Sequence, residues 1–171
     1  MGAAARDTFR SLQVRNFRLF FGGQLISQTG TWLMMVAQTL LVLDITGSGV
    51  AVGLLAAFQF GPVLVLGAWA GSIADRSDKK VLLTRLQTAA MVQSLALAAV
   101  VLAGAASLTA IYALALAKGV ITAFDNPARR AFVVEMVPTR LVPNAVSLNS
   151  TVMTGSRVLG PALAGVLGYD L

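Results

Sequence analysis

A stripe of polar side chains lies within the first long apolar stretch of the chain. Gln24, Gln28, Thr31, Met35 and Gln38 follow one another at helical spacing. At about 100° per residue they fall within roughly 80° of one helix face. Amide side chains in a membrane need hydrogen-bond partners, because hydrocarbon offers none. The stripe therefore indicates either the wall of a watery substrate pathway or a set of interhelical hydrogen bonds.

Two cations stand within apolar stretches. Arg157 is about twelve residues, or roughly 18 Å, into the last stretch, close to the middle of a bilayer. An arginine there costs at least about 2.5–3.5 kcal/mol on insertion scales, which favours a functional role over a structural bond to backbone carbonyls. Lys118 lies nearer a helix end, so its stem can reach the interface. Trp32, beside the polar stripe, is either a cavity lid or a packing residue.

We assign these side chains to a candidate substrate pathway: Gln24, Gln28, Thr31, Gln38, Lys118 and Arg157. The chain contains no cysteine and no histidine, which removes thiolate metal ligands, disulfides and the usual proton shuttle. The carboxylates Asp44, Asp75 and Asp125 lie near the ends of apolar stretches rather than deep within them. We therefore expect no enzyme activity, no catalytic residue, no cofactor and no metal site.

The elements that hold these residues are membrane helices. Hydrophobic residues make up 57% of the chain and charged residues 12%, which depart from soluble averages in opposite directions. About 20 apolar residues in helical form are enough to cross the hydrocarbon core. We predict an all-α membrane protein with five transmembrane helices, at about residues 17–43, 50–74, 81–103, 108–124 and 145–167.

The basic residues give these helices an orientation. Eleven of the thirteen lysines and arginines fall in alternate gaps, and the gaps at 44–49 and 104–107 contain none. This asymmetry predicts a cytoplasmic N-terminus in the plasma (inner) membrane. Residues 127–143, where apolar and charged residues mix, are expected to form a cytoplasmic interfacial segment. Membrane topology accounts for the net charge of +6, so we expect the lipid bilayer, not nucleic acid, as a partner.

One inner turn resembles the signature of a known family. Gly71, Asp75, Arg76, Lys79 and Lys80 match the G-x-x-x-D-[RK]-x-G-[RK]-[RK] pattern of the major facilitator superfamily, except that Asp78 replaces the family's second glycine. By charge alone this turn is an ordinary topology anchor. The resemblance implies instead a conformational latch, in which these residues join Asp125 at the inner end of the fourth span.

The fifth span carries a second resemblance. Gly160, Pro161 and Gly165 are similar to the superfamily's antiporter signature G-P-x-x-G-G, with Ala164 replacing the first glycine of the final pair. These small residues are expected to let helices pack closely. The stretches around Pro127–Ala131, Asn144 and Asn149 are similar to the secretion-effector group, which includes the enterobactin-exporter type. The fourth span departs from its own family signature, because Ala115 stands where arginine is expected.

The resemblance implies that residues 1–171 form a single N-terminal transporter half that lacks its sixth span and the C-terminal half. Such halves rock about a midplane site. The implied function is transport of a small molecule by alternating access, as efflux through an ion-coupled secondary transporter. The charge of Arg157 favours an anionic substrate. The alternative is a truncated or non-transporting membrane fragment or subunit with packing roles only. Substrate, coupling ion, direction and oligomeric state are left open.

Overall fold

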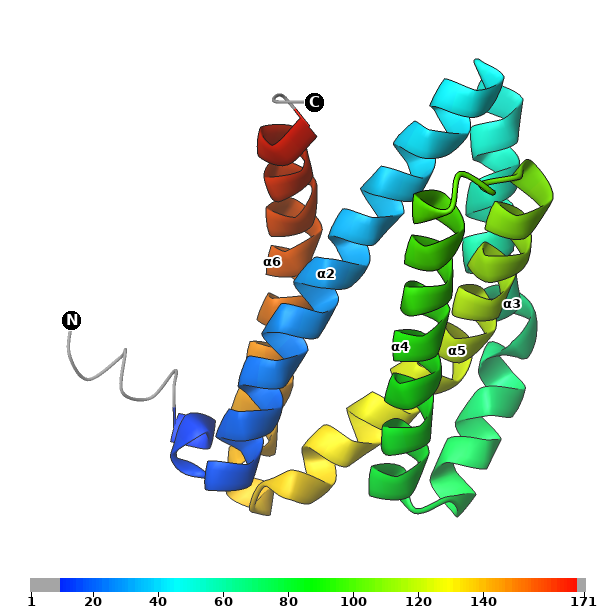
Figure 1. The fold of residues 1–171 in the computed structure, drawn as a ribbon. Helices are drawn as coiled ribbons and strands as arrows, with labels where there is room; N and C mark the ends of the chain where they lie inside the picture. The colour runs from blue at the N-terminus through cyan, green and yellow to red at the C-terminus, as the bar shows by residue number, and fades with distance from the viewer. Residues whose placement is uncertain (1–9, 169–171) are drawn as a thin grey trace. The chain divides into compact units, whose positions relative to one another are not determined.

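The computed structural model describes residues 10–168, and every regular element in this range is helical. Arg6, one of the basic residues before the first predicted span, lies outside the described residues. Figure 1 shows the course of the chain. The elements are η1 (Arg10–Gln13), α2 (Arg15–Thr46), α3 (Gly49–Arg76), α4 (Lys79–Leu102), α5 (Leu108–Met136), η2 (Thr139–Leu141) and α6 (Val142–Gly168).

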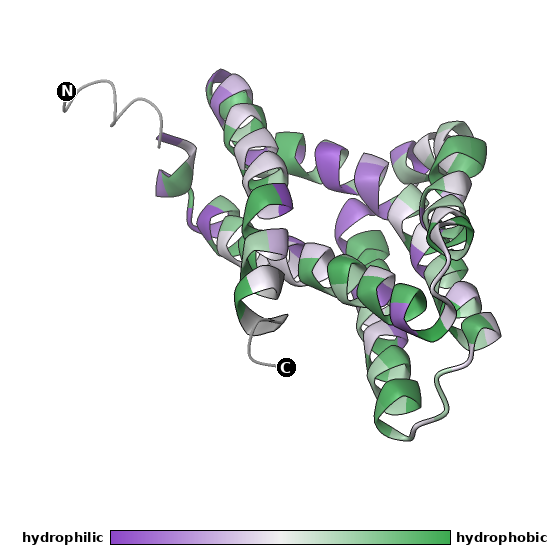
Figure 2. Ribbon diagram, turned by 90° about the horizontal axis from the view of Figure 1, so that it is seen from above, coloured by the Kyte–Doolittle hydropathy of each residue, from purple (hydrophilic) through white to green (hydrophobic). Residues whose placement is uncertain are grey.

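The surface of these helices is suited to lipid. Large apolar side chains are widely exposed, among them Leu64 at 86%, Val65 at 80% and Ile26 at 78%. Figure 2 shows hydrophobic residues recurring along the helices, with hydrophilic residues in shorter stretches. Soluble monomers rarely leave so much contiguous apolar surface in water. The exposed apolar residues therefore agree with a chain that crosses a bilayer several times.

Four helices are long and apolar enough to cross a membrane, namely α2, α3, α4 and α5. The prediction of five such spans differs from this result at α6. Its 27 residues are long enough, but Ser147, Asn149, Thr151, Thr154 and Arg157 lower its hydropathy. The fifth predicted span is thus present as a helix that is too polar to be identified as a span by composition.

The described chain divides into two compact units, which we describe separately. Unit 1 comprises residues 1–37 and 132–171, and unit 2 comprises residues 38–131. The boundaries fall inside α2 and α5, so each of these two helices contributes residues to both units.

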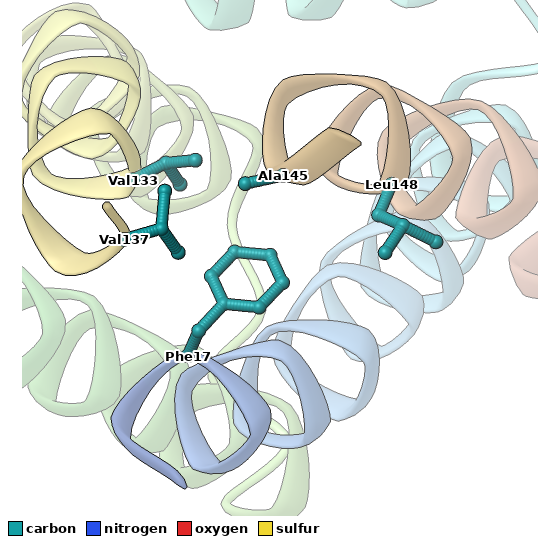
Figure 3. Packing of buried hydrophobic residues seen from close by; sticks show 5 residues of the cluster. All are labelled: Phe17, Val133, Val137, Ala145 and Leu148. Atoms are coloured by element: carbon teal, nitrogen blue, oxygen red, sulfur yellow. The ribbon is translucent and has the colours of Figure 1, made fainter. Parts of the chain in front are cut away.

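Unit 1 is built around the ring of Phe17 at the start of α2. Val133, Val137, Ala145 and Leu148 surround this ring, and all are buried (Figure 3). Farther along, Gly160 of α6 lies against Trp32 of α2. Because contacts move toward higher numbers on both helices, α2 and α6 run parallel.

In unit 2, α3 packs against the end of α2 and against α5. Val42, Ala51, Leu55, Ile111 and Ala115 form its buried apolar cluster. The hydroxyl of Tyr112 on α5 donates to the carbonyl of Ala51 on α3 at 2.9 Å. The turns after α2 and α4 use Gly47 and Gly104, which have φ of 61° and 65°. These are backbone conformations that favour glycine.

The segment at residues 127–143 begins within α5, which continues through Pro127 as far as Met136. Proline at an internal position removes one backbone donor, but neighbouring bonds can hold a helix together across it. Only the short η2 stands between α5 and α6. The location of this segment at the cytoplasmic interface stays a prediction.

Candidate functional site

The guanidinium of Arg157 has an aromatic partner. Its Cζ lies over the ring of Trp32, 5.4 Å from the ring centroid, and the Arg157 side chain is otherwise exposed. Cation–π contacts of this kind contribute about 0.5–1 kcal/mol when exposed and about 2 kcal/mol or more when desolvated. A guanidinium stacked on a ring still has its N–H groups free in the plane. Arg157 can therefore keep the aromatic contact and donate to an anion at the same time.

Gly160 allows α6 to approach α2 closely beside Trp32. Gly160 is buried, and a Cβ built on it would clash with the Cβ of Trp32 and lie 3.1 Å from the backbone nitrogen of Leu33. Hydrogen alone at this position lets the two backbones meet. Arg157 is three residues earlier, about one turn along α6, so the close approach brings its side chain to the Trp32 ring.

Unit 1 also contains three buried polar atoms without a hydrogen-bond partner in the described part of the chain. They are Gln24 Nε2, Asn149 Oδ1 and Ser156 Oγ. A buried polar group without a partner costs about 1–3 kcal/mol. Asn149 and Ser156 lie on the face of α6 that also buries Ala145 and Gly160. These atoms are available to bind a ligand or a part of the protein beyond the described residues.

Gln38, at the end of the polar stripe, belongs to unit 2 and makes an interhelical bond. The Gln59 amide nitrogen on α3 donates to the Gln38 amide oxygen at 2.9 Å, and both residues are buried. Gln38 Nε2 has no partner within residues 10–168. For Gln38 the structure therefore shows the hydrogen-bonding alternative, while Gln28 and Thr31 are only half-buried.

Sequence reasoning missed Gln59 and Gln93, two amides on helices to which no substrate-pathway residue was assigned. Gln93 of α4 donates to the carbonyl of Leu114 on α5 at 3.2 Å, and its own oxygen has no partner among residues 10–168. Gln59 is the single amide of its apolar stretch, and Gln93 has only Ser94 as a polar neighbour among residues 89–102, so their isolation was the available signal. A lone amide in a membrane helix needs a partner as much as a stripe does.

Lys118 lies next to a close helix approach in unit 2. Lys118 is half-buried, and its neighbour Gly119 is buried. A Cβ at Gly119 would stand 2.7 Å from the carbonyl oxygens of Phe58 and Gln59. Pro62 cannot donate to the Phe58 carbonyl four residues earlier, so that oxygen is accessible to the neighbouring helix. The crossing of α5 over α3 thus uses a glycine where a proline has freed a carbonyl.

The inner turn between α3 and α4 places its charges in different roles. Asp75 and Arg76 are exposed in the last turn of α3. Lys79 Nζ donates to the backbone carbonyl of Asp75 at 3.3 Å. Asp78 is the N-cap of α4 and accepts from the backbone N–H of Val81 at 2.9 Å. The residue that departs from the family pattern therefore caps a helix.

Asp125 pairs with a residue of its own helix. Arg129 donates through Nε and Nη2 to the two Asp125 oxygens at 2.8 and 2.9 Å, and the Gln87 amide on α4 donates to Oδ1 at 3.1 Å. Arg129 is buried. The sequence did not point to Arg129 or Gln87 as partners. The predicted link from Asp125 to Asp75 remains a prediction.

The remaining glycines of the two signatures lie in open surroundings. A Cβ at Gly71 or Gly165 would meet nothing within 4 Å among the residues described. Pro161 is exposed within α6. In contrast to Gly160, these positions make no close contact here, so their small size has no explanation within this part of the protein.

The fold and these sites define a multi-pass membrane protein, and comparison with known proteins identifies its class. The chain belongs to the transmembrane secretion effector family of the major facilitator superfamily, whose model matches residues 6–168. Members of this family are transporters, so the chain is not assigned to an enzyme class. The family predicted from the sequence motifs is confirmed.

Two transporters are similar to this chain over most of its length. The chain is 26% identical over 151 residues to the staphyloferrin A transporter of Staphylococcus aureus (strain NCTC 8325 / PS 47), covering 88% of this chain and 38% of that protein. It is 30% identical over 145 residues to the uncharacterized MFS-type transporter YfiS of Bacillus subtilis (strain 168), covering 84% of this chain and 34% of that protein. No solved structure gives a significant match. The chain thus spans little more than a third of the length of these relatives.

Proposed function

We propose that this chain is the N-terminal part of a secondary transporter that exports a small anionic molecule by alternating access. Membership of the secretion effector family supports transport. The antiporter-like Gly160-Pro161 stretch favours export over uptake. The proposal that the substrate is anionic is supported by Arg157. Its exposed guanidinium lies over Trp32 in a predicted span without a carboxylate.

The proposed pathway consists of Arg157 with the polar side chains of α2, chiefly Gln24, Gln28 and Thr31. Arginine presents a planar set of donors that matches a carboxylate or phosphate. The amides and the unpartnered Ser156 hydroxyl supply additional hydrogen bonds for such a ligand. Asp75, Arg76, Lys79 and Lys80 are proposed to latch the inner side during the cycle, together with Asp125 and Gly71.

Staphyloferrin A is the first probe to use, because one relative is named for its transport. The complete protein that contains this chain would be produced in cells that lack their own exporter for this compound. We expect faster appearance of staphyloferrin A in the medium than from cells with an empty vector. Equal rates from both cells, at normal membrane abundance, would exclude this substrate. Failure with a panel of anionic compounds would favour a membrane subunit without transport.

A further inference from the structure

Three prolines lie inside long helices of the described chain, namely Pro62 in α3, Pro127 in α5 and Pro161 in α6. A proline has no backbone N–H, and its ring crowds the carbonyl four residues earlier, so a helix bends most readily where one stands. In α5 the carbonyl that loses its donor belongs to Ala123, which is 1% exposed. Bulk water therefore does not replace the missing hydrogen bond, and this turn of α5 depends on other contacts.

The residues around Pro127 distinguish α5 from the other two helices. Asp125 stands two residues before this proline and Arg129 two residues after it, so opposite charges flank it. The same positions around the prolines of α3 and α6 hold apolar residues, namely Phe60, Leu64, Leu159 and Leu163. Among these three helices, an ion pair can therefore form across the proline in α5 alone.

This ion pair is closed and largely buried. Arg129 Nη2 lies 2.7 Å from Asp125 Oδ2, and the Arg129 and Asp125 side chains are 6% and 13% exposed. Two N–H groups of the guanidinium, on Nε and Nη2, donate to the two carboxylate oxygens. Charge-assisted, paired hydrogen bonds of this kind are shorter and stronger than neutral ones. They fix the distance between positions 125 and 129 more firmly than exposed ion pairs on a helix surface do.

The pair spans the side of α5 on which a proline bend acts. At about 100° per residue, Asp125 and Arg129 both lie about 160° around the helix from Pro127. Because the proline ring pushes the helix away from itself, the opposite face becomes the inner face of the bend. The pair holds this inner face at a fixed length, so it limits the bending of α5 at Pro127.

A neighbouring helix holds the pair in place. Gln87 on α4 donates to Asp125 Oδ1 at 3.1 Å, so this oxygen accepts hydrogen bonds from two helices. After residue 131, α5 continues as part of unit 1. The pair therefore stands just before the point where α5 passes from one compact unit to the other.

We propose that Asp125 and Arg129 form a clamp across a proline hinge, so that α5 bends further at Pro127 when the pair opens. Asp125 is also a member of the proposed latch. Recruitment of its carboxylate by the cations of the inner turn would take it from Arg129 and release the hinge. The clamp itself depends on contacts within α5 and with α4, so it requires neither a particular substrate nor a direction of transport.

A distance measured along α5 by pulsed electron spin resonance tests the proposal. Leu116 and Val134 are 42% and 44% exposed. Spin labels would be attached to Leu116→Cys and Val134→Cys in a cysteine-free version of the complete protein. These positions are about five helical turns, or roughly 27 Å, apart, and both lie within about 20° of the face of Pro127. Side chains reach about 5–6 Å from a helix axis, so an additional bend of about 20° lengthens this distance by roughly 2 Å.

The test variant is Asp125→Leu with Arg129→Met, which removes both charges and leaves neither one buried without a partner. We expect the label distance to lengthen by roughly 2 Å, or its distribution to widen by as much. Adding Pro127→Ala supplies an N–H to the Ala123 carbonyl and should restore the original distance. The matched control is Gln87→Leu, which removes the bond from α4 but keeps the pair, so its label distance should not change.

The proposal is overturned by an unchanged distance in the test variant, by an equal change with and without Pro127, or by the same change in Gln87→Leu. If the test variant does not accumulate in the membrane, Arg129→Lys takes its place, because lysine keeps the charge but not the paired donors. The label distance should lengthen there too, and an unchanged distance would equally overturn the clamp. Because no transport is measured, failure of the proposed export would leave this result unaffected.

Discussion

At the scale of single residues, Arg157 is the side chain whose chemistry points most directly to function. Its depth and the lack of a carboxylate in its span were evident from the sequence. Its contact with Trp32 was not, because it depends on how closely α6 approaches α2 at Gly160. An aromatic face neutralises a cation only in part, so the N–H groups of Arg157 still require acceptors.

Substitution of Arg157 should separate transport from membrane insertion. Arg157→Lys keeps the charge but loses the planar set of donors, so we expect lower activity. Arg157→Met should lower transport about tenfold or more, the equivalent of about 1.4 kcal/mol. Insertion should not suffer, because removing a charge at mid-bilayer depth lowers its cost. Export and membrane abundance are measured together in the complete protein.

Trp32→Phe serves as the control for this pair, because it keeps an aromatic face for Arg157. It should retain more activity than Trp32→Leu, which removes the ring. Normal export by Arg157→Met would leave the residue a structural role at most. A collapse of membrane abundance in that variant would show instead that Arg157 holds the helices together.

At the scale of helices, two crossings depend on glycine. Gly160 of α6 meets Trp32, and Gly119 of α5 meets the carbonyls of Phe58 and Gln59. The antiporter-like signature pointed to Gly160. No predicted site included Gly119, and the sequence did not indicate that Gly119 meets the carbonyl that Pro62 frees. Local signatures identify small residues, but the partner surface is determined by the three-dimensional packing.

The crossing at Gly160 predicts a specific effect on stability. Gly160→Ala places a methyl group against the Cβ of Trp32, and such overpacking costs about 1–3 kcal/mol. Gly165→Ala, on the same helix, adds a methyl group where the described residues leave open space. Thermal unfolding of the complete protein in detergent should show a lower midpoint for the first variant only. Equal midpoints would mean that α6 is displaced in the complete protein.

The inner charges predict a contrast between two acidic residues. Asp125→Asn breaks the paired bonds to the buried Arg129, and loss of one partner of a buried pair costs about 3–5 kcal/mol. We therefore expect lower thermal stability. Asp75→Asn changes an exposed side chain, so stability should be kept while export falls if Asp75 acts in the latch. Normal export by Asp75→Asn would reduce the inner turn to a topology anchor.

At the scale of the whole molecule, hydropathy and charge were sufficient to predict a multi-pass helical membrane protein. These measures are informative because the lipid bilayer constrains the length and the apolar composition of each helix that crosses it. They also predicted the helix α6, although its polar residues leave it outside the four helices that are identified as candidate spans. The partners of Gln38, Gln93 and Asp125 could not be predicted, because each depends on the register of neighbouring helices.

The orientation of the chain in the membrane is the last prediction. Basic residues in alternate gaps place the turn between α3 and α4 in the cytoplasm and the turns at 47–48 and 103–107 outside. The chain has no cysteine of its own, so single substitutions Ser48→Cys, Ser77→Cys and Ser107→Cys can each be introduced into a cysteine-free version of the complete protein. An impermeant maleimide applied to intact cells should label positions 48 and 107 and should reach position 77 only after the cells are opened. Labelling of position 77 but not of position 48 in intact cells would reverse the orientation.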